Sequence, residues 1–267
     1  MKNIDGIDPA DDAASYMAVV KVTRKPQKPH LLAEQARVEL ILNEYLHRVT
    51  TGTVAPLGFV GDVRKYHYKI YDSTLPLVLK LKSDLVAKYA GHTCPYCQLD
   101  DVSHIDHYLP RGIFPELSIS LQNLVMSCDT CNSKYKKENW GTGATQEILH
   151  PRYNNLAGQD YLEATATYQM SAVAIRFSIR PGLPLSQLLN LHFDFMHLNT
   201  RYVAKVSANE IPKLRRVLHA APDHASKLVR LQRMIDDQII ANALNSWEHA
   251  FYSSLQPLVQ QIVLGGL

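Results

Sequence analysis

The sequence has no cysteine outside one short segment. Its 267 residues contain four cysteines, which form two Cys-x-x-Cys pairs, Cys94 with Cys97 and Cys128 with Cys131. No cysteine is left over for a disulfide elsewhere, and a reducing compartment favours metal-binding cysteines over disulfides. Two such pairs supply the four thiolates that a tetrahedral zinc ion needs. The sequence therefore predicts a structural zinc site rather than a disulfide framework.

Long apolar runs, a secretory leader and strong charge are also missing. No stretch of about 18 uncharged apolar residues occurs, so we expect no membrane-spanning helix. The first eight residues lack the basic start and apolar stretch of a signal peptide, so we expect a cytoplasmic protein. The net charge of +3 is too small to indicate nucleic-acid binding by itself. Internal repeats and low-complexity segments are absent as well.

The remaining pattern divides the chain into three parts, residues 1–90, 91–140 and 141–267. Apolar residues at helical spacing predict helices at 31–48 and 75–89, whereas Asp8-Pro9 and Lys25-Pro26 interrupt the first 28 residues. The third part predicts a strand or hairpin within 161–179. Helices are expected after it at 184–191, 201–219 and 225–264, with breaks at Pro212 and Pro257. We expect a mostly helical α+β fold, with the middle part between helical flanking regions.

The middle part has a different pattern. Residues 102–107 and 123–126 are strand candidates. Pro110, Gly112 and Pro115 enforce a loop between them. Helix signals begin near Asp129 and continue to the breaker Gly141. The predicted order is strand, loop, strand, helix.

The polar residues of this part suit the hydrolysis of a phosphodiester. That reaction needs a water deprotonated near neutral pH and a divalent cation at the scissile phosphate. His107 is a natural base because the unperturbed pKa of histidine is about 6.5. Its neighbour Asp106 offers a carboxylate that can hold Mg²⁺ or another hard cation. Asn132 can supply a third group from the helix, and Asn123 is placed to hydrogen-bond the loop backbone and fix His107.

Basic residues lie beside this set. Arg111 follows the Asp-His pair, and Lys134, Lys136 and Lys137 follow the second cysteine pair. Lysine clusters are usually solvated surfaces, but next to a candidate metal site these four residues predict contacts with nucleic-acid phosphates. His150 allows two interpretations, an accessory phosphate or metal contact or a structural loop residue.

Several of these segments together resemble a zinc-containing HNH endonuclease. They are Cys94-x2-Cys97, Asp106-His107-Tyr-Leu-Pro, Asn123-Leu-Val and Cys128-x2-Cys131-Asn132-Ser-Lys134. The resemblance covers residues 91–140 and implies a ββα-metal core. In it His107 is the general base, Asp106 and Asn132 bind a catalytic Mg²⁺ or Mn²⁺, Asn123 organises the loop, and the cysteines hold structural Zn²⁺. Asn132 stands where the family's letter pattern has histidine, and it keeps an oxygen donor.

A narrower resemblance concerns residues 106–118, Asn123-Leu-Val, Cys131-Asn-Ser-Lys and Glu147-Ile-Leu-His-Pro. These segments are similar to the HNH subunits of Septu-type anti-phage defence systems. The similarity implies a bacterial antiviral effector whose flanking helices dock an ABC-type ATPase, sometimes within a retron.

Two alternative functions stay open. One is a non-catalytic zinc-ribbon module that binds nucleic acid or protein. Such a module has no need to keep Asp106, His107 and Asn132 together. The other is a stand-alone toxin that cleaves RNA. The sequence does not separate DNA from RNA substrates, because such a core contacts phosphate and ribose rather than base edges.

Overall fold

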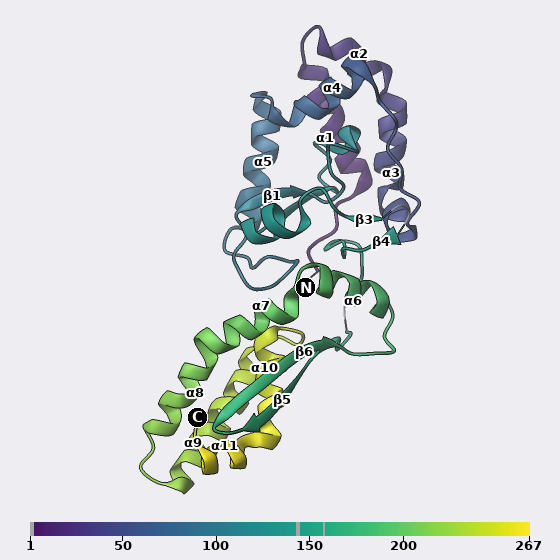
Figure 1. The fold of residues 1–267 in the computed structure, drawn as a ribbon. Helices are drawn as coiled ribbons and strands as arrows, with labels where there is room; N and C mark the ends of the chain where they lie inside the picture. Colours follow the sequence, from purple (N-terminus) through teal and green to yellow (C-terminus); the bar gives the residue numbers. More distant parts are fainter. Residues whose placement is uncertain (1–2, 143–144, 157) are drawn as a thin grey trace. The chain divides into compact units, whose positions relative to one another are not determined.

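The computed structural model describes residues 3–142, 145–156 and 158–267. These residues form a mostly helical chain with three small antiparallel two-stranded sheets (Figure 1). The expected combination of many helices and small sheets is confirmed. By their contacts the residues fall into two compact units, Met1–Ala157 and Gly158–Leu267, here called the N-terminal and C-terminal units. The first two expected parts thus share one unit, which extends past residue 140. No described helix combines the length and apolar character needed to cross a membrane.

The N-terminal unit begins with a series of helices. Their bounds are α1 Pro9–Val22, α2 Gln27–Ala33, α3 Gln35–Thr51, α4 Gly61–Lys69, the 3-10 turn η1 Ile70–Asp72 and α5 Pro76–Tyr89. Asp8 caps α1, because its carboxylate accepts a hydrogen bond from the Ala10 N–H at 2.7 Å. Pro9 occupies the first turn, where a missing N–H breaks no helical hydrogen bond. The expectation that Asp8-Pro9 interrupts structure here is therefore wrong, since the pair begins a helix.

A short hairpin carries the residues of interest. Its strands are β1 His104–His107 and β2 Leu124–Ser127, which pair antiparallel with His107 opposite Leu124. The 3-10 turn η2 Pro115–Leu117 lies in the connecting loop, and the helix η3 Thr130–Lys136 follows β2. The predicted order of strand, loop, strand and helix is present, although η3 is a π-helix rather than an α-helix. The short strands β3 Gly141–Thr142 and β4 Thr145–Gln146 come next.

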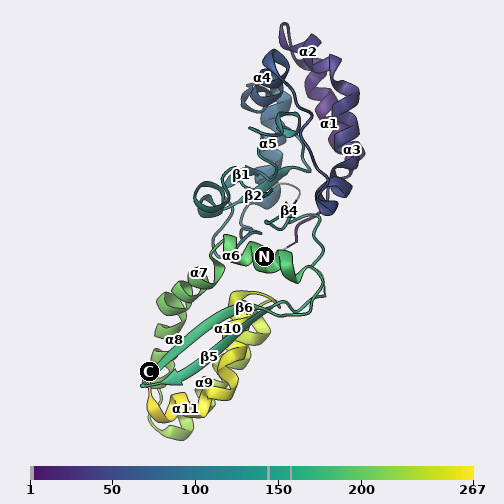
Figure 2. The ribbon, with the colours of Figure 1, turned by 45° about the vertical axis from the view of Figure 1, so that its right-hand side comes forward.

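Apolar packing fixes the hairpin on α5, beside which it lies in both ribbon views (Figure 2). Leu85 and Tyr89 of α5 form a buried cluster with Leu124 and Met126 of β2. A fully buried side chain of this size typically contributes about 1.5–3 kcal/mol to folding. The helix α5 is therefore part of the support for the hairpin.

The C-terminal unit contains a hairpin and a set of helices. The elements are β5 Leu162–Gln169, β6 Ala172–Ile179, α6 Ser186–Phe195, α7 Leu198–Lys205, η4 Val206–Glu210, α8 Ile211–His219, α9 His224–Ala241, α10 Trp247–Leu255, η5 Gln256–Leu258 and α11 Val259–Gly265. The predicted hairpin is confirmed. The single helix expected over 225–264 is wrong, because α9 ends at Ala241 and Ser246 caps a new helix after Asn245, whose φ of 67° is left-handed. The expected break at Pro257 is present as η5.

Candidate active site and metal centre

The four cysteines meet in the N-terminal unit. Their sulfur atoms are buried and lie within 4.8 Å of one another. The sulfurs of Cys97 and Cys128 are 3.8 Å apart, and a tetrahedron with Zn–S bonds of about 2.3 Å has edges of about 3.8 Å. Burial raises the pKa of the Cys94 thiol, so four thiolates at this place need a cation to offset their charge. The donor set fits zinc.

Local backbone geometry brings the two pairs together. The first pair lies on a turn closed by two hydrogen bonds, from Cys94 N–H to the Asp100 carbonyl and from Gln98 N–H to the Cys94 carbonyl, each 2.8 Å. The second pair spans the end of β2 and the start of η3, and the Cys131 N–H points at the Cys128 sulfur at 3.4 Å. An ion held here would tie the segment after α5 to the beginning of η3.

His107 is oriented by the loop that follows it. Its Nε2 lies 2.9 Å from the Ser118 carbonyl oxygen. A carbonyl can only accept, so Nε2 carries the hydrogen and Nδ1 is left with a lone pair in the neutral ring. The pKa of His107 is lowered to about 4, first by burial and also by the positive charges of Arg111 and Lys136, whereas the Ser118 hydrogen bond and the Asp106 charge oppose this decrease. The imidazole is therefore neutral at pH 7, with Nδ1 able to accept a proton.

Asp106 is buried and already hydrogen-bonded. Its Oδ2 accepts from the Tyr96 hydroxyl at 2.7 Å, and its Oδ1 accepts from the Lys136 ammonium at 3.0 Å. The ammonium also donates to the His107 carbonyl at 2.8 Å. Both members of the ion pair are almost fully buried, at 0% and 3% exposure. A divalent cation at Asp106 would have to share the carboxylate with this ammonium.

The structure corrects one expectation for the basic residues. Lys136 was grouped with the predicted phosphate contacts, but its side chain lies inside the protein, where it neutralises Asp106. Removing one partner of such a buried pair typically costs about 3–5 kcal/mol, so the ammonium is held there rather than free to reach a phosphate. Lys136 lies on the buried face of η3 together with Cys131, whereas Lys134 and Lys137, which follows the helix, are exposed.

Asn123 holds the two ends of the loop between the strands. Its Oδ1 accepts from the Leu109 N–H at 2.8 Å, and its Nδ2 donates to the carbonyls of Leu109 and Leu117 at 3.0 and 3.3 Å. The carbonyl that orients His107 belongs to Ser118, the next residue after Leu117. These contacts are the ones that a loop-organising role for Asn123 requires.

Two further buried residues support Asn123. His150 accepts the Arg152 N–H at Nδ1, so its Nε2–H faces the Tyr45 hydroxyl at 3.2 Å, and Tyr45 donates to Asn123 Oδ1 at 2.9 Å. His150 is fully buried, which favours the structural interpretation of this residue over an accessory phosphate or metal contact.

Asp12 of α1 holds the same loop from another side. Its carboxylate accepts from the Ser120 hydroxyl and the Leu121 N–H, each at 2.6 Å. Sequence reasoning missed both Asp12 and Tyr45. They lie on helices far from the motif, and no local pattern connects them to it.

The other predicted residues lie near the surface. Asn132 lies in the first turn of η3, is half-buried, and makes no side-chain hydrogen bond to the described residues. Lys134 and Lys137 are exposed. Arg111 is half-buried and donates to Asp72 at 2.8 Å. The structure thus joins His107, Asp106 and Asn123 through one loop and hairpin, and among the described residues the Asn132 side chain forms no hydrogen bond with the other three.

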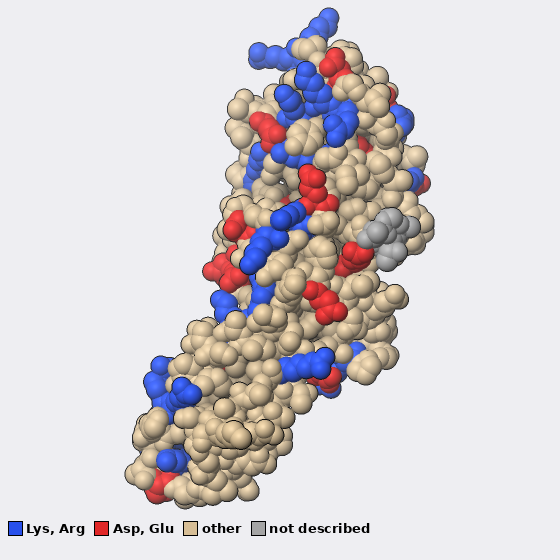
Figure 3. Space-filling view, viewed as in Figure 1, with Lys and Arg blue, Asp and Glu red and all other residues tan. Residues whose placement is uncertain are grey.

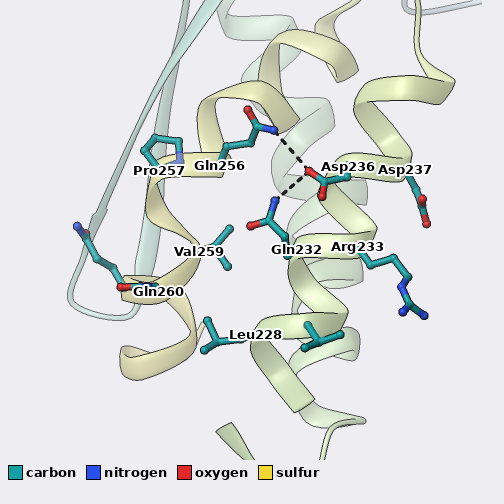
Figure 4. Close-up of a pocket in the computed structure, with 11 residues that line it drawn as sticks. Leu228, Gln232, Arg233, Asp236, Asp237, Gln256, Pro257, Val259 and Gln260 are labelled. Carbon is teal, nitrogen blue, oxygen red and sulfur yellow. Dashed lines mark hydrogen bonds between the residues drawn. The ribbon is translucent and has the colours of Figure 1, made fainter. Parts of the chain in front are cut away.

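The surface charge and the surface grooves indicate a functional site less clearly than the buried contacts do. The face of the N-terminal unit seen in Figure 3 carries Lys and Arg intermingled with Asp and Glu, so it is not uniformly positive. The C-terminal unit has a groove of about 870 Å³ between α9 and the segment Gln256–Gln261. There Asp236 accepts from Gln232 at 2.9 Å and from Gln256 at 3.5 Å (Figure 4). The described residues that line this groove include neither histidine nor cysteine, so we assign no chemistry to it.

Comparison with known proteins agrees with the motif. Residues 94–138 match the HNH endonuclease family. The chain is similar to the protein named ea31 of Escherichia phage lambda, with 31% identity over 103 residues, which are 38% of this chain and 34% of the phage protein. The chain therefore spans about a third of the length of this curated relative. We found no solved structure that matches. The matched segment contains the cysteine cluster, β1, β2 and η3, and residues 94–138 thus form an HNH endonuclease domain.

Proposed function

We propose that this protein is a metal-dependent endonuclease that hydrolyses phosphodiester bonds of nucleic acid. The observation that carries the proposal is the orientation of His107 within a segment that matches the HNH endonuclease family. The hydrogen bond from Nε2 to the Ser118 carbonyl leaves Nδ1 as the acceptor, and burial keeps the ring neutral at pH 7. A non-catalytic zinc ribbon has no need for an imidazole prepared in this way.

In this proposal each residue has a separate task. His107 removes a proton from the attacking water at Nδ1, and Asn123 keeps the loop that orients His107 in place. The four cysteines hold a structural zinc and take no part in the chemistry. Lys134, Lys137 and Arg111 contact phosphates of the substrate backbone, which gives binding without sequence readout.

Asp106 and Asn132 are the proposed ligands of a catalytic cation. Both offer oxygen donors, which suit Mg²⁺ or Mn²⁺ better than a soft metal. When bound, such an ion neutralises charge on the phosphate and stabilises the leaving oxygen. The donors fit in kind, while the Lys136 ammonium already balances the Asp106 charge.

Chelation tests this function. We expect cleavage of DNA or RNA to stop in EDTA at a concentration that leaves the thiolate-bound zinc in place, because oxygen ligands release a hard cation more readily than thiolates release zinc. Added Mg²⁺ or Mn²⁺ should restore cleavage, with zinc content measured in the same samples. Full activity in EDTA with zinc retained would refute the catalytic cation. No cleavage of DNA or RNA under any of these conditions, either by the chain alone or by the chain co-purified with its partner, would refute the nuclease. Parallel DNA and RNA substrates distinguish a general nuclease from an RNA-cleaving toxin.

We further propose that the protein is the effector of an antiviral system of the Septu type, acting with an ABC-type ATPase. The support is the resemblance of residues 106–118 and the neighbouring segments to that group. Exposed apolar side chains on helices outside the motif are also consistent with docking, among them Leu79 and Val86 of α5 and Val229 and Ile240 of α9. Isolated exposed apolar residues are common on monomers, so these side chains alone do not establish an interface.

Co-purification tests the partner. When the chain is expressed with its neighbouring genes, we expect it to elute with a larger ATP-binding subunit. Exchanging Val229 for aspartate should reduce that association, and the same exchange at exposed Met170, on the turn of the β5–β6 hairpin, serves as the control. A monomer that cleaves at its full rate without a partner would contradict this proposal.

A further inference from the structure

The aromatic ring of Tyr71 lies beside His107 and close to two positively charged side chains. The ring of Tyr71 in η1 meets the His107 ring edge to face, with their centroids 4.6 Å apart. The Lys82 ammonium lies 3.9 Å from the Tyr71 centroid, and the guanidinium carbon of Arg111 lies 5.2 Å from it. Lys82 and Arg111 come from α5 and from the loop after β1, so two separate elements bring their charges to one place.

Each cation is held in position. Arg111 donates to Asp72 at 2.8 Å and also lies over the ring of Tyr68, with its guanidinium carbon 4.5 Å from that centroid. Lys82 is one helical turn before Leu85, whose side chain packs against Leu124 of β2. Leu124 is the residue that pairs with His107 across the hairpin. The packing of α5 therefore sets the place of Lys82 relative to His107.

The charges in this cluster do not balance. Asp72 offsets Arg111, whereas Lys82 forms no ion pair with any residue that the structure describes. Burial has the largest effect on the pKa of Lys82 and lowers it. The Arg111 charge lowers this pKa as well, whereas the Asp72 charge raises it. Two cations held near one ring next to the proposed base attract an anion. Lys82 is half-buried and Asp72 is exposed, so solvent and ligand can reach the cluster.

We propose that Lys82 and Arg111, arranged around Tyr71, form a phosphate-binding site that places a backbone phosphate of the nucleic acid beside His107. This inference rests on the proposed nuclease function and adds to it a binding residue outside the matched segment 94–138. Lys82 supplies a charge that forms no ion pair with the described residues, and Arg111 supplies a directed guanidinium. The N-terminal helices then contribute a substrate contact as well as support.

Salt dependence of binding tests this site. His107→Ala protein serves as the parent, so that fluorescently labelled duplex DNA and single-stranded RNA of one sequence stay intact during titration. Loss of one phosphate contact lowers the slope of log K against log salt concentration by about 0.7–0.9. We expect Lys82→Met to show this decrease on the nucleic acid that the parent binds, and Lys82→Arg, which keeps the charge, to retain the parent slope.

Lys80→Met is the matched control. Lys80 lies on the same helix, is exposed and pairs with Asp84 at 2.7 Å, so the substitution removes the same charge away from Tyr71. A decrease with Lys82→Met alone supports the site, provided that thermal melting shows a folded protein. Equal slopes for Lys82→Met and the parent, or equal decreases for both methionine variants, would overturn the site and leave the nuclease intact. A parent that binds neither nucleic acid would overturn the proposed function together with this inference.

Discussion

Replacing Cys128 by serine should unfold the HNH domain and release its zinc. Four buried sulfurs within 4.8 Å of one another form a closed ligand set, and structural zinc of this kind can supply about 10 kcal/mol to local folding. A serine hydroxyl is a poor zinc ligand at neutral pH and leaves the other thiolates buried without enough compensation. We expect the variant to lose zinc by elemental analysis and to lose protection of the β1 and β2 amides in hydrogen exchange.

Ser133→Ala is the control for this change. Ser133 lies in η3, two residues after Cys131, and its hydroxyl donates to Asp129 at 2.8 Å on the exposed side of the helix. Loss of this surface hydrogen bond should change the free energy of unfolding by no more than about 1 kcal/mol. Freshly purified, undenatured protein that contains no zinc, or a Cys128→Ser variant with unchanged exchange, would contradict a structural zinc.

The motif region was the most predictable part of the chain. The cysteine cluster could be predicted because the two cysteines of each pair are close in the sequence. A single turn joins Cys94 to Cys97, and another joins Cys128 to Cys131. The two strands could be placed to within two residues, since Pro110 and Pro115 restrict the loop between them directly. The helix begins where it was expected but ends at Lys136, before the breaker Gly141. What could not be predicted is the π form of η3.

The support of the site was not predictable in the same way. Asp12 and Tyr45 reach the loop from helices about 80 to 110 positions away in the sequence, and no periodic pattern records such contacts. Lys136 was misassigned because a run of lysines indicates a solvated surface, whereas the helical turn directs this one side chain toward Asp106. The long helix expected at the C-terminus is interrupted between Ala241 and Ser246, where the Asn242 side chain donates to the Gln238 carbonyl and Asn245 adopts a left-handed φ, although apolar residues continue at helical spacing on both sides.

Replacing His107 by alanine should abolish cleavage while zinc and fold remain. His107 lies outside the cysteine set, and among the described residues its side chain hydrogen-bonds only to the Ser118 carbonyl. Removal of a general base typically lowers the rate by about 10²–10⁴-fold. Because burial lowers the pKa of His107 to about 4, the ring can accept a proton over the whole range above that value. Wild-type cleavage should therefore persist when the pH falls from 7 to about 5, where an ordinary histidine would be protonated.

His104→Ala separates this effect from a general disturbance of β1. His104 begins the same strand, is exposed, and approaches Asp129 at 3.6 Å, so its loss should leave the rate within a few-fold of the wild type. The two variants lose the same side chain from the two ends of one strand. If His107 is the base, only His107→Ala should lose a large part of the cleavage rate. Zinc content and melting temperature should stay close to the wild type in both variants. Comparable cleavage by both variants with full metal would mean that another group deprotonates the water, because the orientation of Nδ1 would then have no role in the reaction.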